Sequence, residues 1–320
     1  MGSSIDPPRL PMIDLSLFEL GDPWRDQVAA QIDAASSQFG FFYIVGHGID
    51  TSVVAPLMES GRRFFIAGAA EESRVQVAHD SRARTDTNQM VRDLGADRPD
   101  LNEGLYFEAR LAQDLEAEDG DTSVCGQIFL PDVPGFREPM LDYVRSLTGL
   151  AHNLMAMIAR ALRLQDSYFV DRYTGSPGTS FRIFHYPQLV DASAATDQCG
   201  IGTHSDRGLL TILKQDSVGG LELKYQGRWI AVPDIPHAFV CQVGDMLERL
   251  TNGRYLSAAH RVRSSMQGHR VAMPFCFEPN LDALIEPIAG IAAPVASAAS
   301  AESSEAQVNA LPEEAKRVRA

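Results

Sequence analysis

The sequence predicts an α+β protein in which a β-sandwich or β-barrel is carried on a helical scaffold. Between residues 178 and 278, short β-prone runs are separated by turn signals such as Gly219-Gly220 and Asn252-Gly253. Many short strands at this spacing are typical of sandwiches and barrels. Upstream of them, apolar residues recur every three or four positions and predict one long helix over 139–164.

The N-terminal part predicts a mixture of helices and short strands, the first strand over 10–14. Asp22-Pro23 places a capping carboxylate before a proline at the first helical position, which predicts a helix over 22–39. The apolar run 41–45 is rich in β-formers and predicts a strand, and a second helix is predicted over 51–66. Residues 79–124 are polar and irregular, so we expect a long loop region there.

These patterns divide the chain into three parts. Residues 1–125 are expected to form an N-terminal region of helices and strands, and residues 126–289 a catalytic core together with its scaffold helix. Residues 290–320 are rich in alanine and serine, then charged, and lack aromatic residues. Such a composition cannot bury a core, so we expect a mobile tail.

Composition narrows the function classes. The 320 residues carry a formal net charge of −14 without a basic patch, so no nucleic-acid partner is expected. No apolar run reaches the ~20 residues of a membrane span, and the N-terminus does not resemble a signal peptide. The four cysteines lack metal-site spacing, so we expect reduced thiols in a cytoplasmic monomer or simple homo-oligomer that acts on a small molecule.

The segment His204-Ser205-Asp206 is the most informative motif. Residues i and i+2 share one face of a strand, so an imidazole and a carboxylate can converge there. A third ligand would complete a two-histidine, one-carboxylate face, which leaves open positions and is diagnostic of non-haem iron(II) oxygenases. One such triplet arises easily by chance in a chain with eight histidines, so its context decides its meaning.

Two residues supply that context. His260 lies on a later strand candidate and can act as the third ligand. Arg270 lies on the last strand candidate, where a guanidinium can hold a carboxylate through two parallel hydrogen bonds. An arginine on a strand is more often a surface residue, and its register with His260 favours the functional interpretation.

At this point the sequence resembles a known family. The resemblance rests on GFFYIVGHGI, LPDVPGFREPMLDYV, GIGTHSDRGLLTILKQDSVGGLEL, GRWIAVPDIPHAFVCQVGDMLERLTNGRYLSAAHRV and HRVAMPFCFEPN. Together they resemble the 2-oxoglutarate/iron(II)-dependent dioxygenases of the isopenicillin N synthase-like family. The resemblance covers about residues 9–285.

The resemblance implies a fold, cofactors and a site. It implies a double-stranded β-helix, or jelly roll, with flanking helices and a helical N-terminal region. His204, Asp206 and His260 match the family's iron ligands. Arg270 matches the arginine of the R-x-S motif, which binds the distal carboxylate of 2-oxoglutarate, and Tyr186 matches a tyrosine that donates to the same carboxylate. The cofactors implied are iron(II), 2-oxoglutarate and O₂.

The chain departs from the family pattern at two positions. Ala272 stands where the R-x-S motif has serine, which removes a hydroxyl donor worth about 0.5–1.5 kcal/mol. Cys276 stands where relatives often carry phenylalanine, so the substrate chamber is expected to be wider, although an inert buried thiol explains the residue equally well. Arg182 shares a strand face with Tyr186 and can meet an acidic substrate, although a structural role is also compatible with its position.

The function predicted is oxidation of a small organic metabolite by hydroxylation, desaturation or cyclisation, with release of succinate and CO₂. Two alternatives stay open. One is an iron(II) oxidase of the same fold that takes its electrons from the substrate and not from 2-oxoglutarate. The other is a jelly-roll binding protein without turnover, which the three-ligand set with open positions disfavours.

Overall fold

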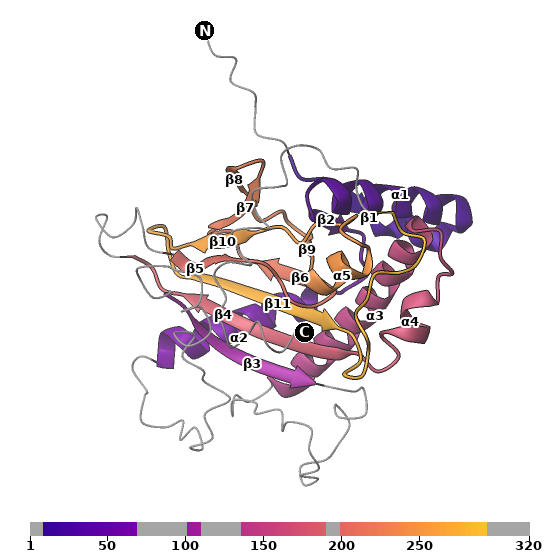
Figure 1. The fold of residues 1–320 in the computed structure, drawn as a ribbon. Coiled ribbons are helices and arrows are strands. Elements are labelled where there is room, and N and C mark those ends of the chain that lie inside the picture. Colours follow the sequence, from indigo (N-terminus) through magenta and orange to yellow (C-terminus); the bar gives the residue numbers. More distant parts are fainter. Residues whose placement is uncertain (1–8, 69–100, 110–135, 190–198, 293–320) are drawn as a thin grey trace.

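Two β-sheets face each other, and the helices pack against the outer face of the larger sheet (Figure 1). The computed structural model describes residues 9–68, 101–109, 136–189 and 199–292. Within these ranges, no helix combines the length and the apolar character needed to cross a membrane.

The larger sheet has seven strands among the described residues. In spatial order they are β1 (Met12–Asp14), β2 (Phe41–Val45), β9 (Phe239–Val243), β6 (Leu210–Gln215), β11 (Arg270–Glu278), β4 (Gly178–Tyr186) and β3 (Glu103–Ala109). Only β1 and β2 run parallel; the other neighbours are antiparallel.

The smaller sheet has four described strands, in the order β5 (Cys199–His204), β10 (His260–Arg263), β7 (Leu221–Tyr225) and β8 (Arg228–Ala231). The helical elements are η1 (Leu15–Leu20), α1 (Asp22–Gln38), α2 (Thr51–Gly68), α3 (Arg137–Ala161), α4 (Tyr168–Arg172) and α5 (Asp245–Leu250). The two outer strands of the larger sheet, β1 and β3, are contributed by segments far apart in the sequence.

Strand alternation separates two apolar cores. On β11, Val271, Met273, Phe275 and Phe277 are fully buried in the core that the larger sheet forms with the helices. Ala272 faces the other way, into a second core between the two sheets, with residues such as Tyr43, Phe184, Leu223 and Val262. On the strands of the larger sheet, every second side chain enters the core beneath the helices. The side chains between them therefore line the interior of the jelly roll.

The predicted fold class is confirmed, and the long helix and most strands lie where the sequence predicts them. Two predictions were wrong. The loop expected over 79–124 contains β3, which pairs with β4 along its whole length; the rest of that loop lies outside the described residues. The strand predicted over 254–262 begins only at His260, because residues 254–256 bond to α1 instead: Arg254 and Tyr255 donate to Asp33, and the amide of Leu256 donates to the carbonyl of Ser36. Residues 293–320 of the expected tail also lie outside the described residues.

Candidate metal centre

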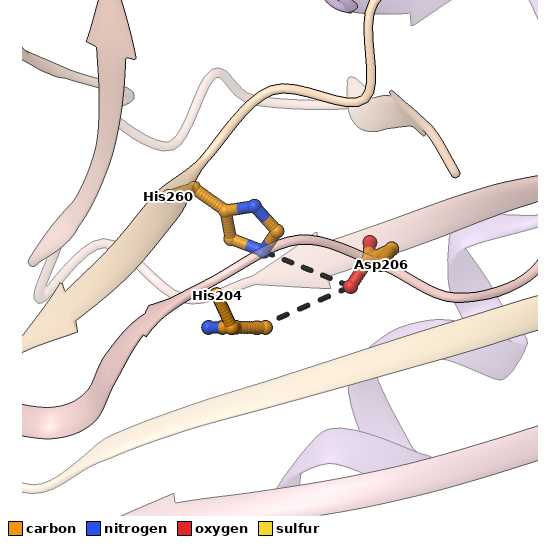
Figure 2. Close-up of side chains that lie close together, drawn as sticks. All are labelled: His204, Asp206 and His260. Carbon is orange, nitrogen blue, oxygen red and sulfur yellow. Dashed lines mark ion pairs between the residues drawn. The ribbon is translucent and has the colours of Figure 1, made fainter. Parts of the chain in front are cut away.

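Three side chains converge at one end of the smaller sheet, where β5 ends and β10 begins. His204 is the last residue of β5, His260 is the first residue of β10, and their Cα atoms are paired across the two strands. Asp206 follows two residues after the end of β5, in the segment that leads into β6. Figure 2 shows both imidazoles and the carboxylate pointing toward one another. From the sequence we expected His204 and Asp206 to share one face of a strand. In the structure β5 ends at His204, and the two side chains converge because the chain turns after the strand.

The ligand atoms are close enough to surround one ion. The Oδ1 of Asp206 lies 3.7 Å from Nε2 of His260 and 4.0 Å from Nε2 of His204, and all three ligand atoms lie within 4.8 Å of one another. The two imidazole centroids are 4.2 Å apart. The arrangement offers two nitrogens and one oxygen from one side, so the opposite side stays open for exogenous ligands.

Backbone carbonyls set the orientation of both imidazoles. Nδ1 of His204 lies 2.9 Å from the carbonyl of Gly202, and Nδ1 of His260 lies 3.1 Å from the carbonyl of Ala258. A carbonyl oxygen can only accept, so each Nδ1 carries the proton and donates. Nε2 is therefore the ring nitrogen of each histidine that faces Asp206 and is available to bind a metal.

The environment of Asp206 fits a bound cation. Its side chain is 17% exposed, and its Oδ2 is buried without a hydrogen-bond partner. An unpaired buried carboxylate oxygen is costly, and a divalent metal would satisfy it. The backbone carbonyl of Asp206 accepts from the amide of Asp245 at 2.7 Å, which ties the ligand segment to the first residue of α5.

Gly244, the N-cap of α5, is required by this packing. A Cβ atom at this position would lie 2.1 Å from the carbonyl oxygen of Gly208 and 3.1 Å from that of Asp206. Any side chain would therefore displace the segment that carries the carboxylate ligand. Neither α5 nor this supporting role of Gly244 was predicted from the sequence.

Arg270 forms a second polar site inside the jelly roll. It is 1% exposed and stands at the start of β11, opposite Tyr186 at the end of β4. Its guanidinium carbon lies 4.6 Å from the centroid of the Tyr186 ring. Nη2 donates to Oε1 of Gln215 at 3.0 Å, whereas Nε and Nη1 are buried and have no hydrogen-bond partner among the described residues. A buried cation with two unused donors is a site for an anion.

Gln215 is a member of this site that the sequence reasoning did not identify. It is 2% exposed, and its Nε2 donates to the carbonyl of Val232 at 2.9 Å. That bond fixes which way the amide points and leaves Oε1 to accept from Arg270. The strand pairing could have revealed it, because Gln215 lies opposite Ala272, two residues after the arginine.

Ala272 and Cys276 occupy the same inner face as Arg270. Ala272 is 2% exposed and lies between Gln215 on β6 and Phe184 on β4. Cys276 lies between Ser180 and Thr211, and the Thr211 hydroxyl donates to its sulfur at 3.9 Å. The expected alternation along β11 is therefore present in the structure.

Arg182 lies near Cys276, because Cys276 of β11 is paired with Ser180, two residues before Arg182 on β4. Burial raises the pKa of the Cys276 thiol to about 11, while the charge of Arg182 lowers that pKa and the charge of Asp206 raises it. Nε of Arg182 donates to the hydroxyl of Ser180 at 3.2 Å. Arg182, Cys276 and the carboxylate ligand are thus within electrostatic range of one another.

The fold and the site together define a class of protein. A jelly roll with two histidines and one carboxylate, open on one side, is the arrangement of non-haem iron(II) oxygenases. Comparisons with known proteins agree. Residues 177–279 match the profile of the 2OG-Fe(II) oxygenase superfamily, and residues 10–125 match the N-terminal profile described as non-haem dioxygenase in morphine synthesis.

Two curated relatives cover most of the chain. A probable iron/ascorbate oxidoreductase of Dictyostelium discoideum is 33% identical over 309 residues, covering 88% of this chain and 85% of the relative. A homoarginine-6-hydroxylase of Oryza sativa subsp. japonica is 31% identical, covering 87% and 88%. Among solved structures, a full-length Neurospora crassa protein in complex with alpha-KG and thymine has a TM-score of 0.74 at 22% identity, covering 89% and 90%, which shows the shared fold.

The chain belongs to the 2-oxoglutarate/iron(II)-dependent oxygenases of the isopenicillin N synthase-like type. It is an enzyme, and its cofactors are iron(II), 2-oxoglutarate and O₂. The family, enzyme and cofactor predictions made from the sequence are therefore confirmed.

Proposed function

We propose that His204, Asp206 and His260 hold iron(II) while Arg270 and Tyr186 bind 2-oxoglutarate, during oxidation of a small organic metabolite. The bound iron supplies the redox chemistry that couples conversion of 2-oxoglutarate and O₂ into succinate and CO₂ to oxidation of the substrate. The protein contributes the geometry of the ligands, the charge that orients the cosubstrate and the exclusion of water from the chamber between the sheets.

The observation that carries this proposal is the buried guanidinium of Arg270. In the described part of the chain, no carboxylate forms an ion pair with it, and Nε and Nη1 have no acceptor. The distal carboxylate of 2-oxoglutarate supplies two oxygens in one plane, which matches the planar fork of the guanidinium. Tyr186 of β4 is paired with Arg270 of β11, and its ring lies against the guanidinium.

An oxidase that takes electrons from its own substrate is the second candidate. A Dictyostelium discoideum relative named 1-aminocyclopropane-1-carboxylate oxidase is 29% identical over 317 residues. Ala272 favours this candidate, because the methyl group cannot donate the hydrogen bond of the family's serine. Arg270 opposes it, because an oxidase of that kind leaves the buried cation without an anion. Membership of an enzyme family argues against the non-catalytic binding protein.

On the substrate side, we propose that Arg182 and Cys276 line the chamber. Their support is strand alternation on β4 and β11, together with the influence of the charges of Arg182 and Asp206 on the pKa of the Cys276 thiol. Hydroxylation is the default outcome, and desaturation or cyclisation needs only a different position of the substrate. The named relatives include a homoarginine hydroxylase and a protein crystallised with thymine, both of which concern small molecules.

Several broader features are also proposals. We infer a cytoplasmic monomer or simple homo-oligomer without a nucleic-acid partner, supported by the net charge of −14 and by the free thiols of Cys241 and Cys276. We propose the division into 1–125, 126–289 and 290–320 as functional regions, although β1, β2 and β3 of the first region complete the larger sheet of the second.

The test measures products. The protein is loaded with iron(II) without O₂, mixed with isotopically labelled 2-oxoglutarate, and exposed to air in the presence of a metabolite library. We expect labelled succinate, with one succinate formed for each oxidised substrate molecule. Substrate oxidation without succinate would establish the oxidase alternative in its place.

A further inference from the structure

Helix α2 contacts the residues that flank the proposed cosubstrate clamp, defined here as Arg270, Gln215 and Tyr186. Figure 1 shows α2 beside β4, near the β3 edge of the larger sheet. We propose that Arg62 of α2 is a positioning residue for 2-oxoglutarate: through Asp216 it fixes the main chain that carries Arg270 and Gln215. The proposal rests on the proposed role of Arg270 as the carboxylate-binding residue.

Asp216 is the centre of the connection. Its Oδ2 accepts from Nη2 of Arg62 at 2.8 Å and from the amide of Val271 at 2.7 Å, and its Oδ1 accepts from the amide of Val218 at 3.1 Å. Its own amide donates to the carbonyl of Val271 at 3.1 Å. Asp216 directly follows Gln215 and Val271 directly follows Arg270, so one carboxylate holds the backbone beside both clamp members.

Arg62 reaches the clamp from the other side as well. Its Nη1 donates to the carbonyl of His269 at 3.1 Å. His269 directly precedes Arg270, so the guanidinium of Arg62 ties both backbone neighbours of Arg270, one directly and one through Asp216. The side chain of Arg62 is 30% exposed, whereas that of Asp216 is 8% exposed, so the connection runs from the surface helix into the interior.

Aromatic contacts extend the connection to Tyr186. The Phe65 ring stacks on His185 with centroids 5.2 Å apart and planes at 10°, and His185 stacks on His269 at 5.1 Å and 14°. Nε2 of His185 lies 3.0 Å from Nδ1 of His269, within hydrogen-bond distance. His185 directly precedes Tyr186, so α2 contacts a backbone neighbour of every member of the clamp.

The helix lies directly on the sheet at this point. A Cβ atom at Gly61 would lie 2.7 Å from Cγ2 of Ile183 on β4, so a larger residue would lift the helix away. Phe65 lies four residues after Gly61 and three residues after Arg62, so it is a neighbour of each on the surface of α2. The absent side chain of Gly61 therefore permits the contacts that Arg62 and Phe65 make.

This arrangement predicts an effect on 2-oxoglutarate more than on the fold. Without Arg62, Asp216 still accepts from two backbone amides, so its buried carboxylate keeps partners and the sheet remains paired. The strand ends that carry the clamp lose their ties to α2. A bidentate contact depends on sub-ångström placement, so looser strand ends weaken cosubstrate binding.

The experiment compares neighbouring arginines on one helix. Arg62→Met keeps an unbranched apolar stem and removes the guanidinium, whereas Arg63→Met removes an exposed arginine that pairs with Glu59. We expect Arg62→Met to raise the KM and Kd for 2-oxoglutarate about 10- to 100-fold, the range found for residues that orient a ligand-binding group. We expect kcat and iron affinity to stay within about twofold, Arg62→Lys to restore part of the binding, and Arg63→Met to match the unmodified chain.

The Kd is measured without turnover, by calorimetry with Mn(II)-loaded protein and 2-oxoglutarate. A cycle with Asp216→Asn adds a second variant that retains the acceptor for Val271. If Arg62 and Asp216 act as one unit, the Kd of the double variant for 2-oxoglutarate is no higher than that of the single variant with the higher Kd. Additive losses, or a 2-oxoglutarate Kd in Arg62→Met equal to that in Arg63→Met, would overturn the positioning role.

The outcomes also separate this inference from the proposed function. If Arg270→Leu abolishes 2-oxoglutarate binding while Arg62→Met leaves it intact, only the positioning role fails. If Arg270→Leu itself leaves 2-oxoglutarate binding unchanged, the clamp assignment fails. A lowered melting temperature with an unchanged Kd in both Arg62 variants would mean that the ion pair serves the fold alone.

Discussion

Replacing Arg270 by leucine tests the cosubstrate site most directly. The side chain is 1% exposed, donates one hydrogen bond to Gln215, and holds Nε and Nη1 without acceptors. Leucine removes the charge and all five N–H donors. The proposed iron ligands belong to β5, β10 and the segment before β6, so they lie outside the strand that carries Arg270.

The magnitude follows from burial. An exposed ion pair contributes about 0–1 kcal/mol, but truncating one partner of a buried, hydrogen-bonded charge pair costs about 2–5 kcal/mol. Since 1.4 kcal/mol corresponds to a factor of ten, the 2-oxoglutarate Kd should rise roughly 30-fold to several thousand-fold. The ligand-free protein should change little in stability, because loss of two unsatisfied donors offsets the new unpaired Oε1 of Gln215, each worth about 1–3 kcal/mol.

The assay follows melting temperature under anaerobic conditions with Mn(II), with and without saturating 2-oxoglutarate. Ligand that binds only the folded protein raises its stability by mass action. We expect this increase in the unmodified chain and in the control Arg145→Leu, which removes an exposed arginine on α3. We expect a much smaller increase in Arg270→Leu, because its raised Kd lowers the bound fraction at the same 2-oxoglutarate concentration. An undiminished increase in that variant would refute the assignment of Arg270 to the carboxylate.

Three further predictions concern the remaining site positions. Asp206→Ala should abolish iron(II) binding, measured by metal analysis after anaerobic purification, while the fold survives because Oδ2 of Asp206 holds no hydrogen bond; full iron-dependent activity in this variant would contradict the ligand set. Ala272→Ser adds a donor two residues from Arg270 and should lower the 2-oxoglutarate KM, by up to about tenfold for one hydrogen bond of 0.5–1.5 kcal/mol; a raised KM would show that the hydroxyl does not reach the cosubstrate. Cys276→Phe should block substrate oxidation while uncoupled succinate formation continues at an unchanged melting temperature; a melting temperature lowered by the ~1–3 kcal/mol of overpacking, with coupling preserved, would place Cys276 in the core.

The regular elements could be predicted because their signals are local. The apolar repeat of α3 and the β-run of β2 each contain enough information within one segment to fix type and approximate bounds. β3 could not be predicted, because its partner β4 lies far along the chain and its own residues do not form an alternating pattern. α5 is six residues long, too short for a helical repeat to emerge from the sequence.

The candidate site divides in the same way. The three metal ligands and Arg270 carry distinctive chemistry, so their residue types and order in the chain are enough to indicate the site. Gln215 and Asp216 carry common polar side chains whose roles depend on which strand lies opposite. Their importance becomes visible only when register places them beside Arg270 and Val271. Sequence reasoning finds residues with distinctive chemistry, and the structure is needed to find the residues that position them.

The two sheets divide the chemistry between them. Both histidine ligands come from the smaller sheet, whereas Arg270, Ala272 and Cys276 lie on the inner face of β11 in the larger sheet. Six residues separate Arg270 from Cys276, which is about 20 Å along a strand at ~3.4 Å per residue. The cosubstrate end and the substrate end of β11 are therefore too far apart for direct contact, and each can change without moving the metal ligands. Substitution at Cys276 is accordingly expected to alter which molecule is oxidised, whereas substitution at Arg270 alters whether 2-oxoglutarate is bound.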